Sequence, residues 1–198
     1  MSHYLLSTTK TVLNQLATKR LSIVSTTIAI SSFLVGAPAI AQQPQDYFCG
    51  PEVPKESLSI EDIIPALYSI VSGDAGIKKN WSLLRKLHSP EAIITPLFHK
   101  DGKPRAKAHS VDEFIALNEK IFKDINFYEN EVKSKIFTYG HMATILSRYE
   151  SRDDLQAAPY AQGINSFQLL NDGRRWCVIS VTWDSDKGGH LLSKGMLK

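Results

Sequence analysis

The order of two hydrophobic periodicities most constrains the fold of this chain. Apolar residues recur at helical spacing in three segments before about residue 124, and from residue 128 onward they alternate with polar residues at the spacing typical of strands. A block of amphipathic helices followed by a block of strands must bury the apolar helix stripes against one face of a sheet. The sequence therefore predicts an α+β domain, with three N-terminal helices packed on a curved, mostly antiparallel sheet.

Two serine-based patterns mark helix starts. Ser59 precedes Asp62, and Ser110 precedes Glu113, at the spacing of a capping box, in which two side chains satisfy backbone amides of the first turn. Gly73 favours the end of the first helix because glycine tolerates the left-handed backbone found there. We expect helices over 59–73, 76–87 and 110–124, with His88-Ser89-Pro90 closing the second.

Turn signals divide the rest of the chain into strands. Asp101-Gly102 follows a strand over 92–98 and starts a short return to His109, and Asn171-Asp172-Gly173 joins strands over 163–170 and 175–183. Two further strands are expected over 128–136 and 142–149. In the first of these a charged set should face solvent, namely Glu129, Glu131, Lys133 and Lys135. The expected inward sets are Tyr128, Asn130, Val132, Ser134 and Ile136, then Met142, Thr144, Leu146 and Arg148.

Residues 1–41 have the three parts of a secretory signal. The segment has three basic residues and no acidic one, an uncharged apolar run over 21–35, and small residues at Ala39 and Ala41. The run is shorter than the roughly 20 apolar residues of a membrane span. We expect cleavage after Ala41 and a periplasmic or secreted product that does not bind the membrane; an uncleaved anchor is the alternative.

Removal of the signal makes the remaining chain electrically neutral. The full chain has 23 basic and 20 acidic residues, so losing three basic ones leaves 20 of each. A neutral domain lacks the basic surface that binds nucleic acid, so we expect no such partner. The expected organisation is an extended arm over 42–57, one domain over 58–184 and a loose tail over 185–198. Cys49 and Cys177 either form one disulfide across a long loop or are two separate buried thiols.

Two segments resemble nuclear-transport-factor-2-like (NTF2-like) domains. Residues 66–74, Ala-Leu-Tyr-Ser-Ile-Val-Ser-Gly-Asp, are similar to the end of the first helix in that superfamily, and residues 163–183 are similar to its last hairpin, particularly in exported bacterial members and SnoaL-like domains. The resemblance implies a cone in which helices and a curved sheet enclose a pocket open at one end. It covers about residues 57–184, and members of the class have unrelated functions.

The resemblance argues against one known chemistry. Ketosteroid isomerase, a relative in this class, uses a first-helix tyrosine, a basic aspartate and a protonated aspartate. These positions fall near Ala66, near Thr95 and at Asn165, and none of the three side chains is retained in kind. Isomerase activity is therefore disfavoured, and catalysis of any kind is left open.

Five residues are candidates for contact with a ligand in the cone: Tyr128, Arg148, Asn165, Phe167 and Trp183. Arg148 could clamp a ligand carboxylate, or pair with a nearby acidic side chain, or face outward through a register shift of one residue. Asn165 could bond a ligand carbonyl or fasten the sheet. The aromatic rings could line a pocket or simply fill the core.

Four histidines show no spacing typical of a metal site, namely His99, His109, His141 and His190. We therefore expect neither a metal nor another cofactor.

The last hairpin is apolar on both faces, which favours a homodimer through the outer sheet face. Three functions remain open: an exported pocket protein for a small apolar or carboxylate-bearing ligand, a lyase, isomerase or hydrolase, and a non-catalytic interaction domain. A carboxyl group inside the cone beside a histidine would favour the enzyme.

Overall fold

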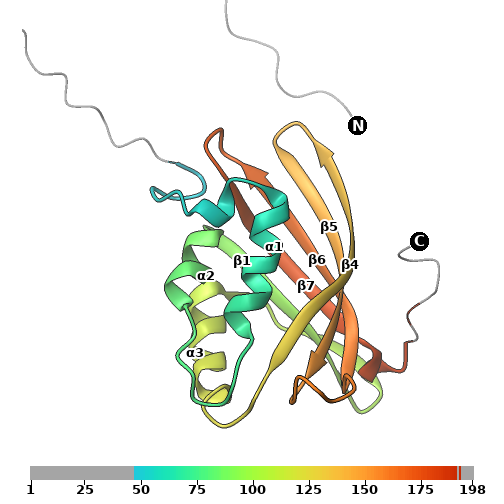
Figure 1. The fold of residues 1–198 in the computed structure, drawn as a ribbon. Helices are drawn as coiled ribbons and strands as arrows, with labels where there is room; N and C mark the ends of the chain where they lie inside the picture. The colour runs from blue at the N-terminus through green and yellow to red at the C-terminus, as the bar shows by residue number, and fades with distance from the viewer. Residues whose placement is uncertain (1–46, 191, 193–198) are drawn as a thin grey trace, which may run out of the picture. The chain divides into compact units, whose positions relative to one another are not determined.

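The structure of the protein is a computed structural model that describes residues 47–190 and 192 (Figure 1). The expected signal peptide, its cleavage site and the first part of the arm lie outside the described residues. The helical and 3-10 elements are η1 (Lys55–Ser57), α1 (Ile60–Val71), α2 (Trp81–Leu87), α3 (Val111–Ile121) and η2 (Asp186–Gly188). The strands are β1 (His88–Lys100), β2 (Lys103–Ala106), β3 (His109–Ser110), β4 (Tyr128–Tyr139), β5 (Met142–Arg152), β6 (Ala161–Asn171) and β7 (Trp176–Ser185).

The strands form one sheet whose long path has the order β2-β1-β7-β6-β5-β4, and β3 pairs with β1. Every pairing is antiparallel except that of β1 with β7, which is parallel. The three helices lie together on one side of the curved sheet (Figure 1). The predicted α+β cone of three helices on a mostly antiparallel sheet is therefore confirmed.

The helix starts follow local side-chain chemistry. The Ser59 hydroxyl accepts a hydrogen bond from the Asp62 amide, and Ser110 forms both halves of its capping box with Glu113. Helix α2 begins later than expected, at Trp81, because the Asn80 side chain caps it by accepting from the Leu83 amide at 3.0 Å. Helix α3 ends at residue 121, three residues before the predicted end.

Strand β1 begins directly after α2, where a closing turn was expected. His88 is its first residue and pairs with Val178 of β7, so the strand is longer than the predicted 92–98 at both ends. The prediction covered only the apolar run, whereas pairing with β7 holds residues on either side of that run in the strand as well. At the other end of the sheet, β7 continues to Ser185 and η2 follows, so the first residues of the expected loose tail are structured.

The arm is tied to the β6–β7 hairpin. A disulfide joins Cys49 to Cys177 of β7, with the Cα atoms 5.6 Å apart. The Arg175 side chain, only 1% exposed, donates to the Cys49 carbonyl, and Arg174 donates to the Gly50 carbonyl at 2.7 Å. The described part of the arm is thus packed against the hairpin instead of extending from it.

A bulge in β4 reverses the predicted facing of its first half. The register with β5 shifts between Glu131 and Lys133. Before the shift, the carboxylates of Glu129 and Glu131 point toward the helices and accept hydrogen bonds from Ser151 and Ser147 of β5. The expectation that these two glutamates face solvent is wrong. Tyr128 and Asn130, which were predicted to face inward, lie on the outer face of the sheet. Val132 is the extra residue of the bulge and has no partner in β5.

The phase of β5 was also predicted one residue out. Its buried residues are Ala143, Ile145, Ser147, Tyr149 and Ser151. The residues predicted to face inward therefore lie on the outer face: Met142, Thr144, Leu146 and Arg148. Both alternating sets contain apolar residues, so the period of two could not choose between them, and a slip of one residue exchanges the faces.

The core lies between the helices and the inner sheet face. Its fully buried aliphatic residues come from every layer, and include Ile63 of α1, Leu87 of α2, Ile145 of β5, Leu169 of β6 and Val178 of β7. Burial of each such side chain contributes about 1.5–3 kcal/mol. Among the described residues, no helix combines the length and the apolarity that a membrane crossing requires.

Candidate functional site

A cavity of about 330 Å³ lies inside the cone, between the helices and the sheet. Its lining comes from all three helices, from the strands β1, β4, β6 and β7, and from the connections that precede β4 and β6. The lining residues are Leu67, Tyr68, Val71, Leu84, His88, Ile94, Phe114, Asn118, Ile121, Phe122, Ile125, Phe127, Glu129, Tyr160, Asn165, Phe167, Val181 and Trp183. The volume is at the small end of ligand pockets, which span about 300–1,000 Å³.

Aromatic rings form much of the apolar wall. Phe114 of α3 meets Trp183 of β7 edge to face, with ring centroids 6.3 Å apart. Phe122 and Phe127 stack with centroids 5.3 Å apart. Such rings give an apolar ligand a large contact area and hold one another in place.

The floor of the cavity is polar. Asn165 Nδ2 donates to the Tyr68 hydroxyl at 3.0 Å and to Glu129 Oε1 at 3.3 Å. The Tyr68 and Ser147 hydroxyls are 2.6 Å apart, and Ser147 donates to a carboxylate oxygen of Glu131. Since a carboxylate can only accept, the donors must run in one direction, from Asn165 through Tyr68 and Ser147 to Glu131. Buried and connected in this way, the floor is a pre-formed polar network.

Glu129 is the titratable group of this network. Its side chain lines the cavity, and the residue is partly buried. Burial raises the pKa of the Glu129 carboxyl to about 7, although hydrogen bonds from Asn165 and Ser151 act in the opposite direction. Burial disfavours the charged form of an acid, and two donors do not replace full hydration. Near neutral pH this carboxyl group exists in both protonation states.

Three tyrosines around Glu129 remain neutral. Burial raises the pKa of Tyr68, Tyr149 and Tyr160, and the nearby Glu129 charge raises it further. Tyr149 lies over Gly163, where an added β-carbon would be 2.6 Å from the tyrosine hydroxyl. The phenols are therefore hydrogen-bond donors throughout the physiological pH range.

His88 lines the cavity as a neutral ring. Burial lowers the pKa of His88 to about 4, and its Nδ1 lies 2.8 Å from the Leu84 carbonyl oxygen. A carbonyl only accepts, so Nδ1 carries the proton and Nε2 is left as an acceptor. His88 follows the last residue of α2, as expected of a residue that closes this helix, and it also belongs to the cavity wall.

Three of the five predicted ligand contacts come together in the cavity, namely Asn165, Phe167 and Trp183. Arg148 does not line it: the guanidinium lies on the outer face, 3.1 Å from Gln162 Oε1 and 3.6 Å from Glu150 Oε1. Of the alternatives that the sequence left open for Arg148, the structure has the outward-facing side chain paired with an acidic residue. Tyr128 also lies outside the cavity lining, with its hydroxyl donating to Asp74.

The sequence reasoning missed Tyr68, His88, Glu129 and Tyr160. Tyr68 lies four residues after Ile64 in α1, on the apolar helix face, and this spacing could have placed it in the cone. It lies two residues beyond Ala66, where the tyrosine of the isomerase pattern was placed. Glu129 had no such signal, because its inward direction depends on the bulge in β4.

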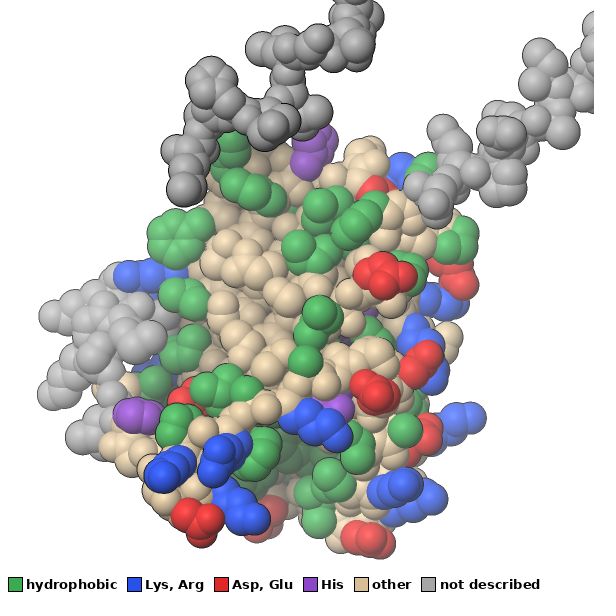
Figure 2. All heavy atoms as spheres, turned by 180° about the vertical axis from the view of Figure 1, so that it is seen from behind, with side chains coloured by type: hydrophobic (Ala, Val, Ile, Leu, Met, Phe, Trp, Pro, Cys, Tyr) green, Lys and Arg blue, Asp and Glu red, His purple; other side chains and the backbone are tan. Residues whose placement is uncertain are grey.

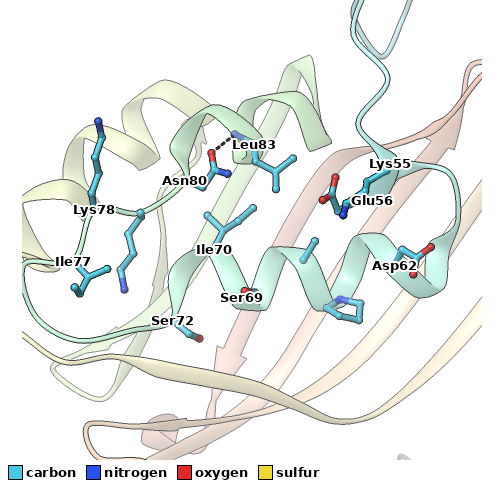
Figure 3. Close-up of a pocket in the computed structure, with 13 residues that line it drawn as sticks. Lys55, Glu56, Asp62, Ser69, Ile70, Ser72, Ile77, Lys78, Asn80 and Leu83 are labelled. Carbon is cyan, nitrogen blue, oxygen red and sulfur yellow. Dashed lines mark hydrogen bonds between the residues drawn. The ribbon is translucent and has the colours of Figure 1, made fainter.

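A larger hollow of about 800 Å³ lies outside the cone, beside α1 and the chain leading into α2. Figure 3 shows its lining, in which Lys55, Glu56 and Asp62 lie at one end and Lys78 at the other. These are solvated side chains of both charges around a shallow surface. The smaller inner cavity is the better candidate, because it combines apolar walls with a buried acid and a fixed donor network.

Comparison with known proteins found similar solved structures of low sequence identity. No protein-family model matches the chain, and no curated protein matches it. Similar solved structures include an NTF2-like protein of unknown function from Silicibacter pomeroyi, with 14% identity over 63% of this chain and 91% of that chain at a TM-score of 0.45. Another, from Nostoc punctiforme, has a cystatin-like fold and unknown function, with 9% identity over 66% and 95% of the two chains at a TM-score of 0.48. An NTF2-like protein from Cytophaga hutchinsonii has 10% identity over 65% and 99%, at a TM-score of 0.45.

Proposed function

We propose that the cone cavity binds a small, mostly apolar molecule that carries a hydrogen-bonding group. One observation carries the proposal: the Glu129 carboxyl and the Asn165 amide meet at the floor of a cavity whose walls are otherwise largely apolar. A pocket of this kind selects ligands by shape on the walls and by a few polar contacts on the floor.

The floor defines the polar group of the ligand. Both amide protons of Asn165 are used by Tyr68 and Glu129, and no described residue bonds its carbonyl oxygen. That oxygen is available to a ligand hydroxyl or amine. Protonated Glu129 can donate to a ligand carbonyl, while the ionised form repels a carboxylate. An alcohol, phenol or ketone therefore fits better than the carboxylate-bearing ligand that Arg148 suggested.

A second function, acid–base catalysis on such a ligand, is favoured by the pKa of Glu129. A general acid or base works best when its pKa lies near the working pH, and burial raises that of Glu129 to about 7. His88, a neutral acceptor, lines the same cavity. One cavity therefore contains both a carboxyl group and a histidine, the two residue types that would favour an enzyme.

Native mass spectrometry of the mature protein from a periplasmic extract tests the binding function first. We expect an extra mass that disappears on denaturation, and loss of that mass in Asn165→Leu but not in Arg148→Ala, whose side chain lies on the outer face. Incubation of the released compound with fresh protein then separates the two functions, since a carrier returns it unchanged and an enzyme converts it. Equal occupancy in both variants would contradict the cavity as the site.

We further propose that the protein is exported to the periplasm or secreted, and that it forms a homodimer. The disulfide supports export, because disulfides persist in oxidising compartments.

Apolar side chains on or beside the outer sheet face support the dimer, including Phe137 at 60% and Met142 at 58% exposed. Figure 2 shows few charged side chains in the middle of this face, whereas Lys and Arg gather toward its lower part. A mass of one chain, unchanged by Phe137→Glu, would contradict the dimer.

A further inference from the structure

Three metal-ligating side chains lie together outside the cone cavity. His99 is the penultimate residue of β1, and Asp184 is the penultimate residue of β7. His190 lies two residues after the end of η2. One ligand atom from each lies within 4.8 Å of the others. None of the three lines the cavity of the proposed function, so this cluster is a separate feature of the fold.

His99 is largely buried, and its ring nitrogens form no hydrogen bond with the part of the chain that the structure describes. Its side chain is 16% exposed, and its Nε2 atom is buried with no hydrogen-bond partner among the described residues. Its Nδ1 atom is 3.9 Å from Asp184 Oδ1, beyond hydrogen-bonding distance. A buried polar nitrogen without a partner costs free energy, which a bound ion would recover.

The η2 turn is built around the His99 ring. A β-carbon on Gly188 would be 2.3 Å from Cε1 and 2.5 Å from Nε2 of that ring, so a larger residue at this position would have to displace the ring. Two residues later the His190 ring lies 5.9 Å from the His99 ring, centroid to centroid, at an interplanar angle of 62°. The close approach of the backbone brings the second histidine beside the first.

We propose that His99, Asp184 and His190 bind one divalent transition-metal ion, with zinc(II) as the ion that this ligand set suits. Two imidazoles and one carboxylate are common zinc ligands, and three protein ligands leave a coordination position open. Bonds of about 2.0–2.2 Å require the ligand atoms to draw slightly closer together. The exposed His190 side chain can make that movement. The bound ion would fasten the chain after β7 to the end of β1.

Zinc titration of the tag-free protein, after removal of metal with a chelator, tests the proposal by calorimetry. We expect one zinc ion per chain. His190→Ala removes an exposed ligand and leaves the core unchanged. Loss of a side chain that only supports a metal ligand weakens metal binding by about 10–100-fold, so loss of the ligand itself should weaken zinc binding by more. Gly188→Ala should also weaken binding by displacing the His99 ring. His141→Ala is the matched control, because His141 is an exposed histidine in a turn distant in sequence from the cluster.

Cobalt(II) substitution supplies a second readout. Cobalt in a site of nitrogen and oxygen ligands should give visible absorption bands that His190→Ala and Asp184→Asn abolish and His141→Ala preserves. Absence of zinc binding at micromolar concentrations would overturn the proposal. So would zinc affinity that is equal in the wild type and His190→Ala.

Discussion

Asn165 Nδ2 donates to Glu129 Oε1 across 3.3 Å, although the strands that carry these residues are not neighbours. β5 lies between them and contributes the small side chains Ser147 and Ser151 to the inner face. Their size leaves room for the glutamate and the amide to meet above the strand. This contact joins the edge strand β4 to the centre of the sheet and sets the polarity of the cavity floor.

The pKa of Glu129 predicts how stability depends on pH. With a folded pKa of about 7 against an ordinary value of 4.5, the folded state keeps a proton that the unfolded state has lost. The Glu129 carboxyl therefore lowers the free energy of unfolding progressively as pH rises from 4.5 to 7, by on the order of 3 kcal/mol. Glu129→Gln should match the wild type near pH 4 and exceed it in stability at pH 8.

Urea unfolding of both proteins at several pH values measures this difference. His88 acts in the opposite direction, because its lowered pKa destabilises the fold as pH falls from 6.5 toward 4. The comparison removes this contribution, since both proteins retain His88. Glu119→Gln, on the exposed face of α3, is the matched control for the chemical change from carboxyl to amide. A difference between wild type and Glu129→Gln that does not vary with pH would contradict the burial of this charge.

Asn165→Leu should destabilise the protein by about 1–3 kcal/mol, because the Tyr68 hydroxyl and the Glu129 carboxylate each lose a donor inside the cone. Asn118→Leu is the comparison, since the Asn118 side chain donates to the Phe114 carbonyl one turn earlier in the same helix and has no other partner among the described residues. Chemical denaturation measures both. Similar losses in the two variants would show that the network contributes nothing specific.

Gly163→Ala should cost about 1–3 kcal/mol through overpacking. The added β-carbon would lie 2.1 Å from the Asp184 carbonyl oxygen and 2.6 Å from the Tyr149 hydroxyl oxygen. The carbonyl belongs to the backbone of β7 and cannot rotate away, so the sheet itself must shift. Thermal unfolding should detect the change, with Ser166→Ala on the outer side of the same strand as control. An unchanged melting temperature would mean that the strands separate easily here.

Replacing both Cys49 and Cys177 with alanine should lower stability by about 2–5 kcal/mol. The bridge closes a loop of 128 residues and anchors the arm to β7, so its loss frees the unfolded chain. Denaturation of the wild type with and without a reductant should give the same difference. If reduction has no effect, the contacts of Arg174 and Arg175 hold the arm without the disulfide.

Local signals explain the parts of the fold that the sequence predicted. Ser59 and Ser110 cap α1 and α3 with their own side chains, and the Asn171–Gly173 turn joins β6 to β7 within a few residues. Each feature depends on neighbours close in the chain, so each is visible in the sequence. The order of helices and strands then determines the α+β class.

Bulges explain why the facing of several side chains could not be predicted. One inserted residue near position 132 turns Glu129 inward, and a register shift opposite Gln168 and Leu169 changes the phase of β7. An inserted residue leaves the composition of a strand almost unchanged while exchanging its two faces. Glu129 was placed in solvent for this reason. Arg148 was placed in the pocket because both alternating sets of residues in β5 contain apolar side chains, so the period of two did not identify the inner one.

The sequence by itself determined the helix caps, the hairpin turns and the layered class, because these follow from short-range hydrogen bonds and periodicity. Only the tertiary structure decided that Glu129, Tyr68 and Asn165 share one floor, and that His99 and Asp184 meet at the far ends of two parallel strands. Those groupings depend on strand register and on bulges. Register is set by packing over the whole sheet, which no local stretch of sequence contains.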